Sequence, residues 1–245
     1  MDMEAFSREA AENLIRLGRN PYPGRGIVLG RSGDGRSLLQ LYWIMGRSAN
    51  SRNRKFVEED GRLRTAPLEA GQMERPELVI YTAMDRHGSH HVVTNGDQTD
   101  TVVESLRAGH DYRDALRSRA HEPDAPNHTP RIAGGIEADT GRAWLAIVKA
   151  QPGDPERSLR YWFEYERLPA GYGWCIHTYA GDGSPLPPFV GEPYPVPLEG
   201  GEDEAFERVW GRLDADNRIA IALKRIDPQN GEAVVRIKNK YLPVG

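Results

Sequence analysis

"RIAGGIEADTGRAWLAIVKA", residues 131–150, places two apolar stretches on either side of the turn sequence "ADTG". Apolar stretches of strand length that are separated by Asp and Gly are typical of a β-hairpin. The same pattern occurs in "RGIVLGR", "SGDG" and "SLLQLYWIMG" within residues 25–46, and in "ELVIYTAMDRHGSHHVVTN", residues 77–95. We therefore expect a protein built mainly from antiparallel hairpins.

Two further hairpins are expected in the second half of the chain. One pairs "SLRYWFEYERL", residues 158–168, with "GYGWCIHTYAG", residues 171–181. The other pairs "RIAIALKRID" with "AVVRIKNKYL" over residues 218–242. Residues 181–201 contain six prolines, which predicts an irregular connection between these two hairpins.

Helical spacing of apolar residues is confined to a few segments. Residues 3–17 predict a helix that ends near Gly18 and Pro21. Residues 101–120 predict one or two helices broken at Gly109, and residues 202–213 an amphipathic helix with acidic residues in its first turn. Hairpins with grouped helices favour an α+β fold of antiparallel sheets covered by helices over a doubly wound fold.

Composition limits the class of protein. A chain of 245 residues with 38% hydrophobic and 28% charged residues suits one sizeable globular domain. The net charge of -4 provides no positive field that would attract nucleic acid or a membrane surface, so neither is an expected partner. A single cysteine, Cys175, excludes an intramolecular disulfide framework. Without a secretory signal or a membrane-spanning stretch, a cytoplasmic protein is expected.

Arginines cluster after the apolar strand of residues 37–46. The stretch "MGRSANSRNRKF" contains Arg47, Arg52, Arg54 and Lys55, with Ser and Asn between them. Guanidinium groups stay charged and bind phosphate in a bidentate way, so the stretch is a candidate phosphate site. The alternative is a solvated basic loop.

Two other polar stretches each have a structural and a functional interpretation. "VVTNGDQTDTV", residues 92–102, either caps the following helix through Thr99 or Asp100, or gathers polar groups at one end of a sheet. "HEPDAPNHTPRIAGG", residues 121–135, is either a rigid connector or a proline-stiffened loop that presents Glu122 and Asn127.

Three other features have simple structural explanations. The glycines of "GRGIVLGRSGDG" lack a following helix, so turns are expected there and not a nucleotide loop. His87, His90 and His91 are expected in a solvated turn and not around a metal ion. Cys175 lies between aromatic residues, which favours a buried thiol over a nucleophile.

Five stretches together resemble the archaeal-type inosine monophosphate (IMP) cyclohydrolase family. They are "YPGRGIVLGRS", "GRSANSRNR", "VIYTAMD", "VVTNGDQTDTV" and "PNHTPRIAGGI", within residues 22–149. The resemblance implies a four-layer α-β-β-α sandwich of the N-terminal-nucleophile hydrolase type, used without self-cleavage. It divides the chain into an N-terminal helical extension, residues 1–20, and a single cyclohydrolase-like domain, residues 21–245.

The family reaction converts 5-formamidoimidazole-4-carboxamide ribotide into IMP with loss of water, without a metal or other cofactor. The resemblance implies that Tyr81 donates a hydrogen bond to the formyl oxygen and that Glu122 takes or relays the proton. It places Arg52 at the phosphate or the reacting centre. The implied substrate-binding residues are Arg47, Arg54, Asn95, Asp100, Asn127 and Arg131. Asp97 and Gln98 are expected to be solvated.

The chain also departs from the family pattern. No Ser, Thr or Cys stands at Tyr22, where an N-terminal nucleophile would lie, and the second half shows little family similarity. Two alternatives therefore stay open, namely an amidohydrolase of the same fold that acts on another amide, and a non-catalytic purine-nucleotide-binding protein. Homo-oligomerisation is an expectation from the family only.

Overall fold

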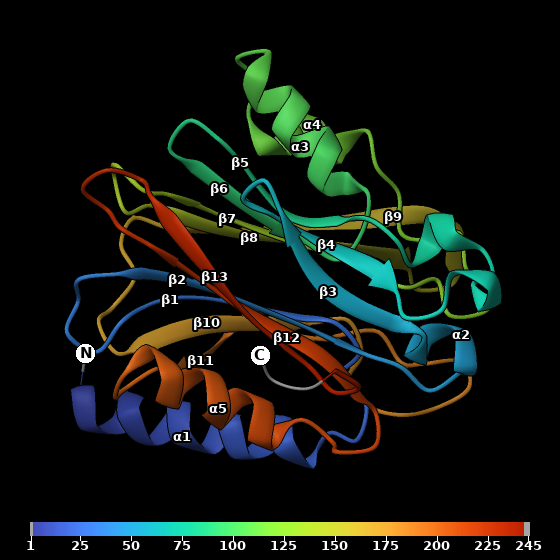
Figure 1. Ribbon diagram of the computed structural model, residues 1–245, viewed down its shortest axis with the longest axis horizontal. Helices are drawn as coiled ribbons and strands as arrows, with labels where there is room; N and C mark the ends of the chain where they lie inside the picture. Colours follow the sequence, from blue (N-terminus) through green and yellow to red (C-terminus); the bar gives the residue numbers. More distant parts are fainter. Residues whose placement is uncertain (1, 243–245) are drawn as a thin grey trace.

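The computed structural model describes residues 2–242 and contains two antiparallel β-sheets stacked face to face (Figure 1). Helices lie on both outer surfaces of this stack, α1 and α5 below one sheet and α3 and α4 above the other (Figure 1). The prediction of an α+β fold in four α-β-β-α layers is confirmed.

The seven-stranded sheet has the strand order β3-β4-β5-β6-β7-β8-β9. Its hairpin β7–β8 is the one predicted from residues 131–150, with Ile132 opposite Ile147. The β5–β6 hairpin is also confirmed. The strands are β3 (Arg54–Glu59), β4 (Arg62–Pro67), β5 (Thr82–His87), β6 (His90–Thr94), β7 (Arg131–Glu137), β8 (Ala143–Gln151) and β9 (Asp154–Tyr165).

The six-stranded sheet has the strand order β11-β10-β1-β2-β12-β13, and it confirms the predicted hairpins β1–β2 and β12–β13. Every residue of β2 is buried, because this central strand is covered on both faces. The strands are β1 (Gly26–Arg31), β2 (Leu38–Met45), β10 (Tyr172–His177), β11 (Tyr194–Pro197), β12 (Arg218–Ile226) and β13 (Ala233–Asn239).

Helices form at the three segments where they were expected, whereas the short helix α2 was not predicted. Gly109 adopts φ +80 between α3 and α4, which explains the break predicted there. The Asp2 side chain caps the first turn of α1. The helices are α1 (Met3–Arg19), α2 (Ala49–Arg52), α3 (Gln98–Arg107), α4 (Tyr112–Arg117) and α5 (Glu202–Arg212).

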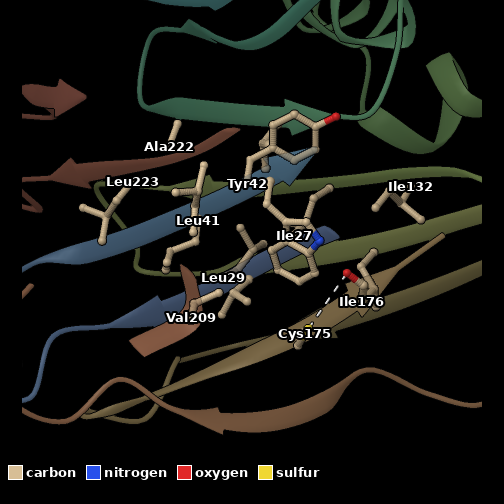
Figure 2. Close-up of a cluster of buried hydrophobic side chains, with 14 of the residues drawn as sticks. Ile27, Leu29, Leu41, Tyr42, Ile132, Cys175, Ile176, Val209, Ala222 and Leu223 are labelled. Carbon is tan, nitrogen blue, oxygen red and sulfur yellow. Dashed lines mark hydrogen bonds between the residues drawn. The ribbon is translucent and has the colours of Figure 1, made fainter. Parts of the chain in front are cut away.

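One large cluster of buried apolar side chains joins the two sheets and the α1–α5 layer (Figure 2). Tyr42 extends from β2, and its hydroxyl lies 2.7 Å from the hydroxyl of Tyr81, which immediately precedes β5 of the other sheet. A smaller cluster packs α3 and α4 onto the outer face of the seven-stranded sheet. No helix within residues 2–242 is long and apolar enough to span a membrane.

The prediction of a hairpin over residues 158–181 is wrong. β9 pairs with β8, whereas β10 pairs with β1 and β11 in the other sheet. The connection between β9 and β10 therefore crosses from one sheet to the other. A tight turn at Gly153, with φ +80, makes β8 and β9 the actual hairpin.

The hairpin β3–β4 was not predicted, although "EEDGRL", residues 58–63, carries a turn signal between its strands. The expected strand at residues 77–81 begins later, at Thr82, because Pro76 starts a short 3₁₀ turn. Tyr81 thus precedes a strand, and its N–H donates to Thr65 Oγ1 at 2.8 Å.

Candidate active site

A cavity of about 320 Å³, lined mainly by polar residues, has Asn50 and Ser51 of α2 in its wall. Figure 1 shows α2 at one end of the sandwich. Loops from both sheets meet there, so residues far apart in the sequence form its wall. The lining residues are Tyr22, Gly24, Arg25, Met45, Arg47, Ser48, Asn50, Ser51, Arg54, Leu78, Val79, Glu122, Asp124, Asn127, Thr129, Tyr179 and Leu186.

A buried ion pair forms the base of this cavity. Glu122 is 5% exposed, and its Oε2 lies 3.2 Å from Nη2 of Arg25. Burial raises the pKa of the Glu122 carboxyl, and the attraction of Arg25 only partly opposes this effect. A carboxyl group with a raised pKa is suited to exchange protons nearer neutral pH.

Asn95 does not line the cavity but hydrogen-bonds Glu122, which does. Its Nδ2 donates to Pro130 O at 2.9 Å and to Glu122 Oε1 at 3.4 Å, and its Oδ1 accepts from Ile132 N at 2.8 Å. Asn95 is fully buried, so this network fixes its orientation. Asn95 of "VVTNGDQTDTV" therefore bonds both to the backbone and to Glu122 on the cavity wall.

The expectation that Gln98 is solvated is wrong. Gln98 is fully buried, and its Nε2 donates to Asn95 Oδ1 at 2.8 Å. Its Oε1 accepts from Arg131 Nη1 at 2.7 Å. Asp97 is exposed, as expected, and pairs with Arg119 and Arg131.

A pair of tyrosines lies near the buried guanidinium. The hydroxyls of Tyr42 and Tyr81 lie 2.7 Å apart and share a hydrogen bond. Tyr81 is 5% exposed and is not among the residues that line the cavity. Burial raises the pKa of Tyr42 well above its ordinary value, so its hydroxyl keeps its proton.

Two wall residues, Arg25 and Tyr179, were missed by sequence reasoning. Arg25 stood within a stretch interpreted as glycine turns, and Tyr179 in a segment with no recognised motif. The Tyr179 hydroxyl hydrogen-bonds Thr129 Oγ1. Gly24 must be glycine, since φ is +74 and an added Cβ would lie 2.2 Å from Thr178 Oγ1.

Two arginines of the basic cluster, Arg47 and Arg54, line the cavity, whereas Arg52 does not. Arg47 reaches the cavity and pairs with Asp182, and Arg54 lines it while donating to Met45 O at 2.9 Å. Arg52 turns elsewhere, and its Nη2 donates to Asn217 Oδ1 at 3.2 Å. The placement of Arg52 at a substrate phosphate therefore lacks geometric support, because the side chain ties α2 to the strand β12 region.

Of the other predicted binding residues, Asn127 lines the cavity, whereas Arg131 and Asp100 do not. Asn127 lines the cavity, where its Oδ1 accepts from Leu186 N at 3.0 Å. Arg131 does not line the cavity; it contacts Gln98, which holds Asn95, and its charge opposes the rise in the pKa of Glu122. Asp100 is exposed on the first turn of α3 and does not line the cavity, because α3 covers the outer face of the sheet.

The histidines and the cysteine are not arranged as a reactive or metal-binding group. His91 is fully buried, so the expectation that it lies in a solvated turn is wrong. His87 and His90 are half-buried at the strand ends that flank the turn. Cys175 is buried as predicted, and burial raises its pKa to about 12. Within residues 2–242, no three His, Cys, Asp or Glu side chains form a group that could hold a metal ion.

Fold and site together define a sandwich protein of two antiparallel sheets, with a small polar cavity at one end and a buried Glu–Arg pair at its base. Residues 22–231 match the family model of the IMP cyclohydrolase-like protein, and the chain belongs to this family. The family resemblance seen in the sequence is thus confirmed.

The chain is similar to IMP cyclohydrolases of several methanogens. That of Methanococcus maripaludis (strain C6) is 32% identical over 131 residues, which cover 52% of this chain and 63% of the relative. That of Methanosphaera stadtmanae is 31% identical over 64% of this chain and 73% of its own length. That of Methanothrix thermoacetophila is 25% identical over 84% and 94%, respectively.

Proposed function

We propose that this protein is an IMP cyclohydrolase that closes the purine ring of 5-formamidoimidazole-4-carboxamide ribotide to give IMP and water. Family membership and the names of the relatives support this activity. The observation in the structure that carries it is the buried carboxyl of Glu122 beside Arg25 on the cavity wall.

The reaction requires proton movement and stabilisation of an oxyanion. The carboxamide nitrogen forms a bond to the formyl carbon and loses one proton, and the formamido nitrogen loses a second proton as its C=N bond forms. The bond between the formyl carbon and its oxygen breaks, and the oxygen leaves as water with these two protons. In our proposal Glu122 relays these protons, since its raised pKa brings its two protonation states closer in free energy near neutral pH. In this proposal Arg25 on the cavity wall stabilises the negative charge that develops on the formyl oxygen. Tyr81, hydrogen-bonded to Tyr42 behind the lining residues, is the hydroxyl that the family resemblance assigns to the same oxygen.

Substrate binding is assigned to the outer part of the cavity. Arg47 is 37% exposed at its side chain and supplies a guanidinium for the phosphate. Asn127 and Arg54 are further binding candidates on the wall. Asn95 acts as a positioning residue, because it donates a hydrogen bond to Glu122 Oε1. Arg131 supports it indirectly, because it donates to Gln98, which in turn donates to Asn95.

The chemistry changes no oxidation state, and we infer that it needs neither a metal nor another cofactor. The purine nucleotide is then a small-molecule partner of the protein. The relationship to N-terminal-nucleophile hydrolases, the single domain over residues 21–245, the cytoplasmic location and self-association stay predictions of the sequence. Tyr22 on the cavity wall supplies no nucleophilic side chain of the kind those hydrolases use.

The proposal is tested by following absorbance after pure protein is mixed with the formamido ribotide, with IMP identified by chromatography. Tyr81→Phe removes one hydroxyl of the pair, and we expect turnover to fall on the order of 10²–10⁴-fold. Tyr161→Phe on β9 is the matched control, since that ring is 39% exposed and remote from the cavity lining.

Absence of IMP with the wild-type protein contradicts the activity. Full turnover by Tyr81→Phe contradicts the role of that tyrosine while leaving the activity in place. Release of a carboxylic acid or ammonia in place of IMP indicates the amidohydrolase alternative.

A further inference from the structure

A second, larger pocket of about 600 Å³ lies between the end of α1 and the proline-rich segment. Arg16, Arg19 and Asn20 form one side of it, and Phe189 and Tyr194 form the other. A volume of this size is within the range of small-molecule sites. The proposed function makes no use of this pocket, which we call the rear pocket.

The rear pocket presents cationic groups that lack carboxylate partners. Within residues 2–242, neither Arg16 nor Arg19 forms a hydrogen bond or an ion pair through its guanidinium. The guanidinium carbon of Arg16 lies 5.0 Å from the centre of the Tyr194 ring. Glu192 is the one carboxylate that lines the pocket. Two free guanidiniums against one carboxylate favour an anionic ligand.

Aromatic rings form the inner wall of the rear pocket. The His177 ring packs edge-on against the rings of Phe189 and Tyr194. The distances between ring centroids are 4.7 Å and 5.8 Å, respectively. His177 Nδ1 lies 2.9 Å from Tyr179 O, so this nitrogen carries the proton and Nε2 remains an acceptor. Burial lowers the pKa of His177 to about 4, which keeps the ring neutral. Rings of this kind provide a surface for a flat ligand.

The same groups connect the rear pocket to the candidate active site. Asn20 Nδ2 donates to Tyr179 O at 3.0 Å, and His177 Nδ1 donates to the same oxygen. The hydroxyl of Tyr179 reaches Thr129 in the catalytic cavity, and its ring stacks on Tyr22 at 5.8 Å. A ligand against Asn20 and His177 therefore contacts the side chains that hold Tyr179.

We infer that the rear pocket is an effector site for a phosphate monoester that carries an aromatic ring, the chemical class of a nucleoside monophosphate. The guanidiniums of Arg16 and Arg19 hold the phosphate, and Phe189 and Tyr194 flank the ring. The family match begins at residue 22, so the α1 side of this pocket lies outside the family core.

The test titrates full-length protein with adenosine monophosphate (AMP) and measures heat of binding. Arg16 and Arg19 are both exposed, so the double variant R16Q/R19Q is expected to fold normally. We expect a saturable site whose affinity falls at least about tenfold in this variant, because two charge-assisted contacts are lost. The exposed Arg8 on the same helix gives the matched control R8Q, which should keep wild-type affinity.

Absence of saturable AMP binding, or equal affinity in wild type and R16Q/R19Q, overturns the site. Equal affinity for inorganic phosphate and AMP overturns the assignment of a ring. The claim that the rear pocket is an effector site is tested by measuring the affinity for IMP with and without AMP. AMP should change this affinity in the wild-type protein and not in R16Q/R19Q. An IMP affinity that is the same with and without AMP contradicts it. The AMP titration does not depend on the proposed function, whereas the IMP measurement rests on it. Lack of IMP binding in the absence of AMP would therefore contradict the proposed function and not the rear pocket.

Discussion

For polar side chains in and around the seven-stranded sheet, the sequence predicts some positions correctly and others not. Glu122 and Asn95 were selected from polar stretches beside apolar strands, and both prove buried and in contact. Gln98 and Asp100 were assigned the wrong way round, since Gln98 points inward and Asp100 outward. The helix that begins at Gln98 sets this alternation, and its start was predicted three residues too late.

Arg25 and Arg52 show a further limit of the sequence at this scale. Both are arginines beside apolar strands, and nothing in composition distinguishes them. Arg25 is buried against Glu122, a partner 97 positions away, whereas Arg52 bonds to Asn217. Which guanidinium reaches the cavity is decided by contacts between distant segments, so local pattern could not reveal it.

Lys224 provides a prediction about stability and pH. This lysine is 1% exposed on β12, and its Nζ finds no hydrogen-bond partner within residues 2–242. Burial, opposed by Asp85 and Glu58 and assisted by Arg86, lowers its pKa to about 8. The unfolded chain then binds more protons between pH 8 and the ordinary lysine pKa of about 10.4. The free energy of unfolding should therefore rise with pH in this window and be lowest below it.

Lys224→Met removes the buried charge while keeping an unbranched side chain. We expect the free energy of unfolding at pH 7 to increase by about 3 kcal/mol, and its rise at alkaline pH to disappear. Urea denaturation at several pH values measures both effects. Lys55→Met on β3 is the control, since Lys55 is only half-buried. A loss of stability in Lys224→Met would mean that the ammonium is well solvated or paired.

Secondary-structure elements were predicted well where the pattern was local. Hairpins with short turns, such as β7–β8 and β12–β13, follow from adjacent apolar stretches and turn residues. The β9–β10 connection was misassigned, because a change of sheet and a hairpin both place two strands on either side of a short loop. Only strand partners distinguish these cases, and partners are a property of the tertiary fold.

The helix α1 lies outside the family match yet packs as part of the sandwich. Asn13 Nδ2 donates to Pro195 O of β11 at 3.0 Å, and Leu14 is 3% exposed within the main core. Truncation of a buried leucine costs about 2–5 kcal/mol. We therefore expect Leu14→Ala to lower the free energy of unfolding of the whole protein by this amount in urea denaturation.

Ile15→Ala on the same helix is the control, because Ile15 is 40% exposed and its truncation should change stability by about 0.5 kcal/mol or less. If Leu14→Ala left the unfolding curve unchanged, α1 would be a separate extension, as the sequence-based division at residue 20 suggests. If Leu14→Ala instead shifts one cooperative unfolding transition of the whole protein, α1 unfolds together with the main domain.

At the scale of the whole molecule, stacking of the two sheets creates the cavity. The loop before β1 supplies Arg25, and the loop before β7 supplies Glu122. These loops belong to different sheets and meet only at the end of the sandwich. Stacking of the two sheets thus brings together a carboxyl group and a guanidinium from distant parts of the chain, and our proposal assigns proton exchange to the carboxyl and charge stabilisation to the guanidinium.

The most direct measurement is the single-turnover rate of ring closure by Glu122→Gln compared with wild type. The amide has nearly the same shape but cannot exchange a proton, so we expect a rate lower on the order of 10²–10⁴-fold. Glu104→Gln, at an exposed position of α3, should keep the wild-type rate. A Glu122→Gln protein that forms IMP as fast as wild type would contradict ring closure at the buried Glu122–Arg25 pair.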